Sequence, residues 1–228
     1  MQEYNTSSSA LDEWRLWQKI SILRRECRAV ETSFIAALFR YLYFRLRHKN
    51  ILASRKVMIR GLGNITTDGL LQIGMMYAGF IPPDEITYLN IHGKLRFRGN
   101  FSLGKGCSVY IGKNATADFG HCYVTGRATF VILHDLKIGD GCVIAWECLF
   151  LDEDFHELDY SGKKNKTNRI EIGNRVWIGS RVTILRGVTI PDGCVVASGS
   201  VVSSSFQTTN CLIAGSPAKV VRENITWV

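Results

Sequence analysis

The chain has 228 residues, of which 46% are hydrophobic and 21% are charged. This composition is ordinary for a globular protein and excludes wholesale disorder. Lys and Arg outnumber Asp and Glu by 28 to 20, but residues 1–60 carry a net charge of +7 and residues 61–228 only +1. The basic character therefore belongs to an N-terminal arm, and we expect no nucleic-acid partner.

The first ten residues are polar and rich in serine, without the basic-then-apolar layout of a secretory signal. The seven cysteines form no CxxC pair and no metal-type spacing with histidine. Seven is also an odd number for a disulfide framework. We therefore expect a cytoplasmic protein with reduced core thiols and no bound metal.

Residues 1–56 are predicted to form a basic, amphipathic helical arm, with two helices within residues 11–50. The longest apolar stretch, Phe34–Leu46, has 13 residues and is interrupted by Arg40 and Arg45. It is too short and too charged to cross a bilayer core of about 30 Å. Three interpretations of the arm remain open: peripheral contact with the inner face of the cytoplasmic membrane, a cap on the domain that follows, or binding of a polyanionic glycan.

Residues 57–228 contain a repeat of six residues, which is most regular after residue 170. The apolar residues at this spacing are Ile172, Ile178, Ile184, Ile190, Val196 and Val202. Small or turn-forming residues follow most of them, as Gly173, Gly179, Pro191, Ala197 and Ser203 show. Six is neither a helix period nor a plain strand period, but it suits a short strand and a corner that recur.

The same period appears upstream in Ile132, Ile138, Ile144 and Phe150, and more loosely from Leu103 onward. Ile138 and Ile172 are 34 positions apart, a distance that six does not divide. Residues 152–169 are polar and charged and carry no aliphatic rhythm. We therefore predict that they form an external loop inserted between two repeats.

These repeats, with the segment VWIGS at 176–180 and the ending NCLIAGSPAKVVRENITW at 210–227, resemble the hexapeptide-repeat acyltransferases. The resemblance is nearest to the branch that O-acetylates sugars, including capsular and sialic acid polysaccharides. It implies a mainly β fold, a left-handed parallel β-helix of hexapeptide repeats with an N-terminal helical arm. It also implies a homotrimer whose sites lie between adjacent subunits.

The resemblance also implies which residues carry the chemistry. His156, in the inserted loop, matches the catalytic histidine, and a neutral imidazole suits proton removal from a sugar hydroxyl. Trp177 resembles a tryptophan beside that histidine, where its indole would offer a flat wall and one N–H donor. Asp154 or Glu157 could accept a hydrogen bond from the second ring nitrogen of His156. The remaining histidines are weaker candidates for the base.

Acetyl-CoA is the co-substrate that the resemblance implies. Ser180, Ser198 and Ser203 match positions that contact this molecule, and Lys219 and Arg222 match the residues that meet its phosphates. Ser204 departs from the pattern, because sugar acetyltransferases often carry lysine there. Arg186 or a residue of a neighbouring subunit could take its place.

The function expected from these residues is acetyl-CoA-dependent O-acetylation of a sugar hydroxyl of a cell-surface polysaccharide (capsular or O-antigen, with sialic acid polymers included) or its precursor. Alternatives are N-acetylation of a nucleotide-linked amino sugar and a non-enzymatic β-helix scaffold. A metal-dependent hydratase would need three converging histidines. His121, His134 and His156 lack the spacing of five that such sites use.

Overall fold

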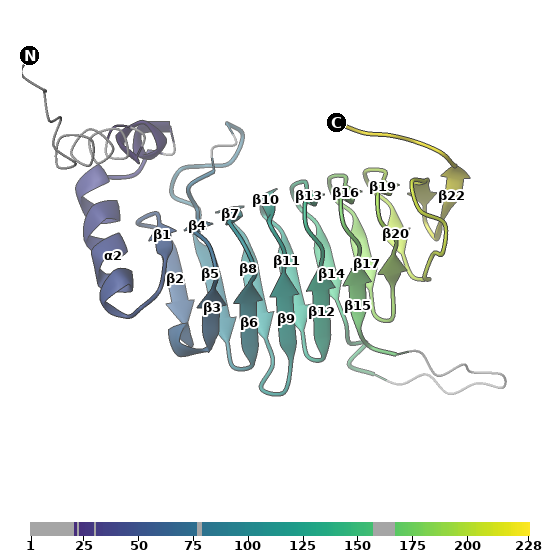
Figure 1. The fold of residues 1–228 in the computed structure, drawn as a ribbon, viewed down its shortest axis with the longest axis horizontal. Helices are drawn as coiled ribbons and strands as arrows, with labels where there is room; N and C mark the ends of the chain where they lie inside the picture. The colour runs from purple at the N-terminus through teal and green to yellow at the C-terminus, as the bar shows by residue number, and fades with distance from the viewer. Residues whose placement is uncertain (1–20, 22, 30, 77–78, 157–166) are drawn as a thin grey trace, which may run out of the picture.

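The computed structural model describes residues 21, 23–29, 31–76, 79–156 and 167–228. Their strands form three parallel sheets, and the chain passes through the sheets in turn to make a left-handed parallel β-helix (Figure 1). This is the predicted fold class. We call the sheets A, B and C, and the three edges of the prism the A–B, B–C and C–A edges.

Each complete coil gives one strand to each sheet, and sheet A also contains the closing hairpin. Sheet A contains β1 (Ile51–Ala53), β4 (Leu71–Ile73), β7 (Phe101–Lys105), β10 (Cys122–Gly126), β13 (Val143–Ile144), β16 (Trp177–Ile178), β19 (Val195–Val196), β21 (Leu212–Gly215) and β22 (Ala218–Arg222). Sheet B contains β2 (Val57–Arg60), β5 (Thr87–Ile91), β8 (Ser108–Ile111), β11 (Thr129–Ile132), β14 (Leu149–Leu151), β17 (Thr183–Leu185) and β20 (Val201–Val202). Sheet C contains β3 (Ile65–Thr67), β6 (Lys94–Phe97), β9 (Thr116–Phe119), β12 (Asp135–Ile138), β15 (Ile170–Ile172) and β18 (Thr189–Ile190). A short 3-10 helix, η1 (Leu62–Asn64), joins β2 to β3.

The hexapeptide aliphatics form the core, as the period predicts. Ile138 pairs with Ile172, and Ile172 pairs with Ile190 on the next coil; all three are buried. Aromatic rings fill the same interior, and those of Phe130 and Phe150 stack with centroids 4.6 Å apart. Each coil thus buries its apolar residues against its neighbours, which makes the end coils dependent on a cover.

The A–B edge turns through residues with left-handed backbone, and their side chains form a ladder of alternating charge. Arg127, Glu147 and Arg181 have φ values of 50°, 61° and 58°. Arg127 lies 3.0 Å from Glu85 and 3.6 Å from Glu147, and Arg181 lies 2.8 Å from Glu147. The pKa of Glu147 is lowered, mainly by its hydrogen bond from Arg181. This ladder ties successive coils together along the edge.

The N-terminal cover is the helix α2 (Phe34–Leu46), which lies at the β1 end of the prism (Figure 1). Ser33 caps its N-terminus, and Ala37 and Phe44 are buried beneath it. Most of the other helix predicted in the arm lies outside the described residues, although Ser21 and residues 23–29 are helical. β1 already belongs to sheet A, so the first strand of the coil lies upstream of residue 57. In the part of the chain that is described, no helix has the length and apolar character to cross a bilayer.

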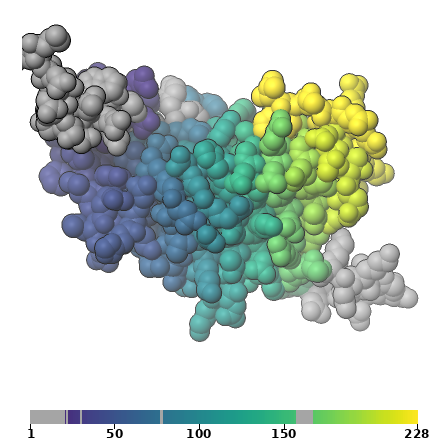
Figure 2. Space-filling view, in the orientation of Figure 1, coloured from purple at the N-terminus to yellow at the C-terminus, as the bar shows by residue number. Residues whose placement is uncertain are grey.

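At the other end the hairpin of β21 and β22 closes the prism, the one antiparallel pair among the described strands. The molecule is elongated along the axis of the coil, as Figure 2 shows. The seven cysteines are free and buried. Their burial agrees with the prediction that they lie in the core.

Candidate functional site

The loop that carries His156 leaves the coil where the sequence predicts, between the end of β14 at Leu151 and the start of β15 at Ile170. Its first residue, Asp152, is buried and accepts hydrogen bonds from the backbone N–H groups of Leu133 (2.7 Å) and His134 (2.8 Å). Burial raises the pKa of Asp152, and the two N–H donors oppose this shift. Asp152 thus fixes the base of the loop to the preceding coil.

A second anchor follows at once. Glu153 Oε2 lies 2.8 Å from Nε2 of His134, and its other oxygen accepts from the N–H groups of Asp154 and Phe155. The pKa of Glu153 is lowered, first by the hydrogen bond with His134. The backbone just before His156 is therefore held in place by one carboxylate.

The returning end of the loop is joined to the same cluster. Nδ2 of Asn168 lies 2.7 Å from Nε2 of His134, and Oδ1 of Asn168 accepts from Arg186 at 3.1 Å. Arg186 also bonds to the carboxylate of Asp154. Both ends of the loop thus meet in one polar cluster at the B–C edge.

His156 itself is exposed beyond this cluster, at the edge opposite sheet A. The carboxylate of Asp154 is directed to Arg186, which differs from the predicted role of Asp154 as an acceptor for the His156 ring. Glu157, the alternative acceptor, lies outside the described residues. The interaction with Asp154 also occupies Arg186, the residue that could replace the lysine missing at 204.

Trp177 lies on the outer face of sheet A, on β16, with 43% of its surface exposed. The ring of Trp227 in the C-terminal tail packs against it, with centroids 6.2 Å apart. The indole N–H of Trp227 donates to the carbonyl oxygen of Arg175 at 2.9 Å. This bond holds the tail over sheet A, beside Trp177.

Ser180 and Ser198 are brought together on the A–B edge, with their hydroxyl oxygens 3.2 Å apart. The coils approach closely there: a Cβ atom on Gly179 would come within 2.7 Å of the backbone nitrogen of Ser198. A Cβ atom on Gly199 would meet nothing within 4 Å. This stretch of the edge is therefore built from small residues and is open to solvent.

The other predicted contacts of the co-substrate lie elsewhere on the last coils. Lys219 pairs with Ala214 in the closing hairpin and Arg222 with Leu212, and both basic side chains are exposed. Ser203 follows β20 toward the B–C edge. It does not join the Ser180 and Ser198 pair within one chain.

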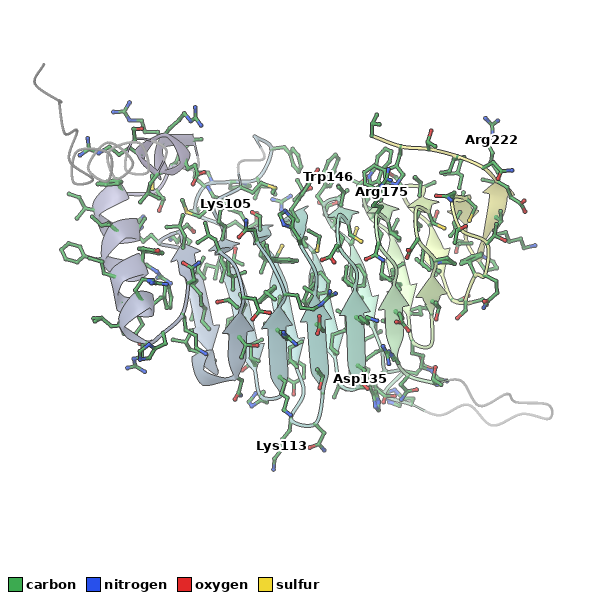
Figure 3. All side chains as sticks on the ribbon, viewed as in Figure 1. Lys105, Lys113, Asp135, Trp146, Arg175 and Arg222 are labelled. Atoms are coloured by element: carbon green, nitrogen blue, oxygen red, sulfur yellow. The ribbon has the colours of Figure 1, made fainter. Side chains whose placement is uncertain are left out.

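Sequence reasoning missed an aromatic pair on the A–B edge. Trp146 accepts a backbone hydrogen bond from Arg181, the neighbour of Ser180, and its ring lies 5.0 Å from that of Phe80 in an edge-to-face arrangement. Figure 3 shows Trp146 at the margin opposite Lys113 and Asp135. The available signal was that Trp146 occupies the corner position held by serine at 180 and 198.

Within one chain the candidate residues form two separate groups. His156 and its anchoring cluster lie at the B–C edge, whereas Trp177, Ser180 and Ser198 lie on sheet A and the A–B edge. Sheet B lies between these two edges, and His156 is at the edge opposite sheet A, which carries Trp177.

Among residues 21, 23–29, 31–76, 79–156 and 167–228, no three His, Cys, Asp or Glu side chains are grouped so that they could hold a metal ion.

Comparison with protein families matches residues 169–204 to the model described as bacterial transferase hexapeptide (six repeats). A protein from Klebsiella pneumoniae, described as an uncharacterized 24.8 kDa protein in the cps region, is 42% identical over 213 residues. The alignment covers 92% of this chain and 96% of the relative.

Solved structures share the fold. A variant of AntD, an N-acyltransferase from Bacillus cereus in complex with dTDP-4-amino-4,6-dideoxyglucose and coenzyme A, has a TM-score of 0.50 and 15% identity. That match covers 76% of this chain and 80% of the other. The polysialic acid O-acetyltransferase OatWY is 27% identical with a TM-score of 0.40, covering 78% of this chain and 86% of the other.

Proposed function

Because the chain belongs to the bacterial hexapeptide-repeat transferase family, we propose that it transfers an acetyl group from acetyl-CoA to a sugar hydroxyl. The proposed acceptor is a cell-surface polysaccharide, of the capsular or O-antigen kind with sialic acid polymers included, or its precursor. The similarity to a protein from a cps region supports the capsular part of this proposal. Such a precursor would be met in the cytoplasm or at the inner face of the cytoplasmic membrane.

The observation that carries the proposal is the anchored loop at the B–C edge. Asp152 and Glu153 fix the backbone before His156, and the hydrogen bond from Arg186 to Asn168 fixes the return of the loop. A general base must be held within hydrogen-bonding reach of the proton that it removes. A histidine on a loop tied at both ends meets this requirement better than one on a free loop.

The reaction that follows from this placement is a direct acyl transfer. The His156 imidazole removes the proton of the sugar hydroxyl while the hydroxyl oxygen attacks the carbonyl carbon of the thioester. The carbon–sulfur bond breaks, and the imidazolium returns the proton to the leaving thiolate. Trp177 supplies a wall and an N–H donor beside this centre, where a donor to the developing negative charge lowers the barrier.

A homotrimer would supply the second half of the site. Rotation about an axis parallel to the prism keeps each residue at its own height, so residues of two chains meet only where their heights agree. β14, which precedes the His156 loop, pairs with β17, which follows Trp177 and Ser180 along the chain. The two groups therefore lie at neighbouring levels, which supports a site formed by the B–C edge of one chain and the A–B edge of another.

The small residues at the A–B edge suit the long, thin arm of acetyl-CoA. Ser180 and Ser198 are exposed or half-buried there, and the space beside Gly199 is open. Lys219 and Arg222 are exposed on the closing hairpin, where they would pair with phosphates. Ser203 would contribute from the B–C edge of the neighbouring chain.

The exposed aromatic pair of Phe80 and Trp146 is the natural candidate for contact with the acceptor. These side chains are 53% and 36% exposed, and they lie on the same edge as Ser180. Aromatic faces offer the flat apolar surface against which a sugar ring can pack.

Replacing His156 tests the proposed function. We expect His156→Ala to reduce acetyl transfer at least about a hundredfold, since a positioned base contributes roughly 10²–10⁴ in rate. The trimer and the melting temperature should stay unchanged because the side chain is exposed. The assay follows acetyl transfer by mass spectrometry on candidate polysaccharides, with nucleotide-linked amino sugars as the competing acceptor class.

His121→Ala is the matched control. His121 is also an exposed histidine, but it lies immediately before β10 and outside the inserted loop. Its variant should retain wild-type turnover. Near-wild-type turnover by His156→Ala would contradict the assignment of the base. Preferential acetylation of the amino sugars would replace the O-acetyl proposal with N-acetylation.

A further inference from the structure

The helix α2 has two apolar faces, and only one of them packs on the coil. Ala37 and Phe44 are buried on the inward face, and Arg40 donates to the carbonyl oxygen of Val57 at 2.9 Å. Capping of the first coil therefore accounts for the inward face alone.

The outward face carries a continuous stripe of large apolar side chains, which we call the outer stripe. Its members are spaced three or four residues apart and lie along one side of the helix: Ile35, Phe39, Leu42, Tyr43 and Leu46. They are 65%, 68%, 49%, 48% and 84% exposed. A helix that is apolar on both sides normally lies in a core or against lipid.

The charged side chains of α2 and of its C-cap residue, Arg47, are all basic. Arg45 and Arg47 are exposed and fall on either side of it, at about 100° from its centre at 3.6 residues per turn. The guanidinium of Arg47 lies 5.2 Å from the ring centre of Tyr43. Residues 33–50 contain no Asp or Glu.

We propose that the outer stripe binds the surface of a bilayer that contains anionic phospholipids. Ile35, Phe39 and Leu46 would enter the boundary between headgroups and acyl chains, while Arg45 and Arg47 would meet the lipid phosphates. This is the arrangement of helices that lie in the plane of a membrane interface. Basic side chains close to such a surface each add attraction to anionic lipids.

Charge complementarity separates this partner from a second copy of the chain. If two outer stripes packed on each other, the arginines that flank one stripe would face those of the other, and like charges oppose such an interface. An anionic bilayer offers the opposite charge over its whole surface. The proposal goes beyond the transfer reaction and does not depend on it, because none of these residues belongs to the candidate site.

The test uses the full-length protein and sedimentation with vesicles of phosphatidylcholine, with or without phosphatidylglycerol. We expect binding to the anionic vesicles that weakens as salt is raised. The double variant Phe39→Asp/Leu46→Asp should bind at least about tenfold more weakly, and Arg45→Gln/Arg47→Gln should lose the preference for anionic lipid. The arginine variant leaves the apolar residues in place, so it reports on charge even if the aspartates disturb folding.

Two matched controls alter the same kinds of residue elsewhere. Ile86→Asp changes an aliphatic side chain of similar exposure (50%). Lys113→Gln removes an exposed basic side chain at the B–C edge, away from α2 (Figure 3). Both should bind anionic vesicles like wild type. The proposal is overturned if wild type does not sediment with either vesicle, or if the stripe variants bind normally. A change in oligomeric mass of the stripe variants without vesicle binding would assign the outer stripe to a second copy instead.

Discussion

At the scale of single residues, the decisive side chain beside His156 is the buried Asp152. Its two carboxylate oxygens each accept one backbone N–H from the preceding coil, from Leu133 and His134. Removing the carboxylate would leave both donors without their acceptor. A buried N–H group that loses its partner typically costs about 1–3 kcal/mol.

We therefore expect Asp152→Ala to lower stability by about 2 kcal/mol and to reduce kcat more than it raises the KM for acetyl-CoA. The loop that presents His156 would be released, whereas the serines on the A–B edge would be unaffected. Urea unfolding and steady-state kinetics measure the two effects. Asp135→Ala is the control, because Asp135 is exposed on the same edge; an equal loss in both variants would contradict the anchoring role.

Burial also decides the chemistry of the cysteines. It raises the pKa of Cys142 and of Cys148 to about 11 and that of Cys107 to about 12. The thiolate is the reactive form, so these thiols stay protonated and protected at neutral pH.

We predict that native protein reacts slowly with a disulfide reagent such as DTNB and that all seven thiols react after unfolding. Because the folded pKa values exceed that of an unfolded thiol, about 8.5, the stabilisation from these groups is complete below that pH. This stabilisation is lost as the pH rises toward the pKa values of the thiols in the folded protein. The free energy of unfolding should be lower at pH 10 than at pH 8. Fast labelling of the native protein by DTNB would refute the prediction of protected thiols.

At the scale of elements, α2 covers an end of the coil that would otherwise expose its core. Phe44 is 4% exposed and belongs to the main core, whereas Phe39 on the same helix is 68% exposed. The two phenylalanines thus give a matched pair that separates the capping face from the outer stripe.

Phe44→Ala should lower the free energy of unfolding by about 3 kcal/mol, since it leaves a cavity beneath the helix. Phe39→Ala should change it by less than about 0.5 kcal/mol. Denaturant unfolding of the two variants gives both values. Similar losses of unfolding free energy in the two variants would show that the outer stripe is also packed in the folded protein.

At the scale of the whole molecule, the prism keeps His156 and Trp177 on different sides, so the proposed site needs two chains. This requirement can be tested by mixing subunits. Random trimers of His156→Ala and Trp177→Ala chains would contain some intact sites. In these sites the Trp177→Ala chain supplies an unmodified His156, and the His156→Ala chain supplies an unmodified Trp177.

We expect each variant alone to be inactive and the co-assembled mixture to recover about a quarter of wild-type activity per site, because sites between identical copies repeat around the symmetry axis. The control mixture pairs His156→Ala with the double variant His156→Ala/Trp177→Ala and should recover nothing. No recovery in the first mixture, with co-assembly verified by mass, would rule out a shared site.

The period of six determined most of the fold from the sequence. An aliphatic residue at every sixth position can be buried only if the chain turns back on itself after each short strand, so Ile172, Ile190 and Val196 had to face one interior. The break of phase before Ile170 placed the loop correctly for the same reason. The role of His156 as the base rests on the resemblance to the acyltransferase family and stays a prediction.

Contacts between coils could not be predicted, because neighbours in space there are 18 to 34 residues apart in the sequence. That Asp154 bonds Arg186 and that Asp152 holds the preceding coil both depend on how successive corners stack. The contact between Trp146 and Phe80 joins residues still further apart in the sequence, from corners that are not successive. The amphipathic sequence of α2 likewise left its partner open. Only the packed structure decided which face covers the coil and which face remains exposed, because both faces are apolar enough to be buried.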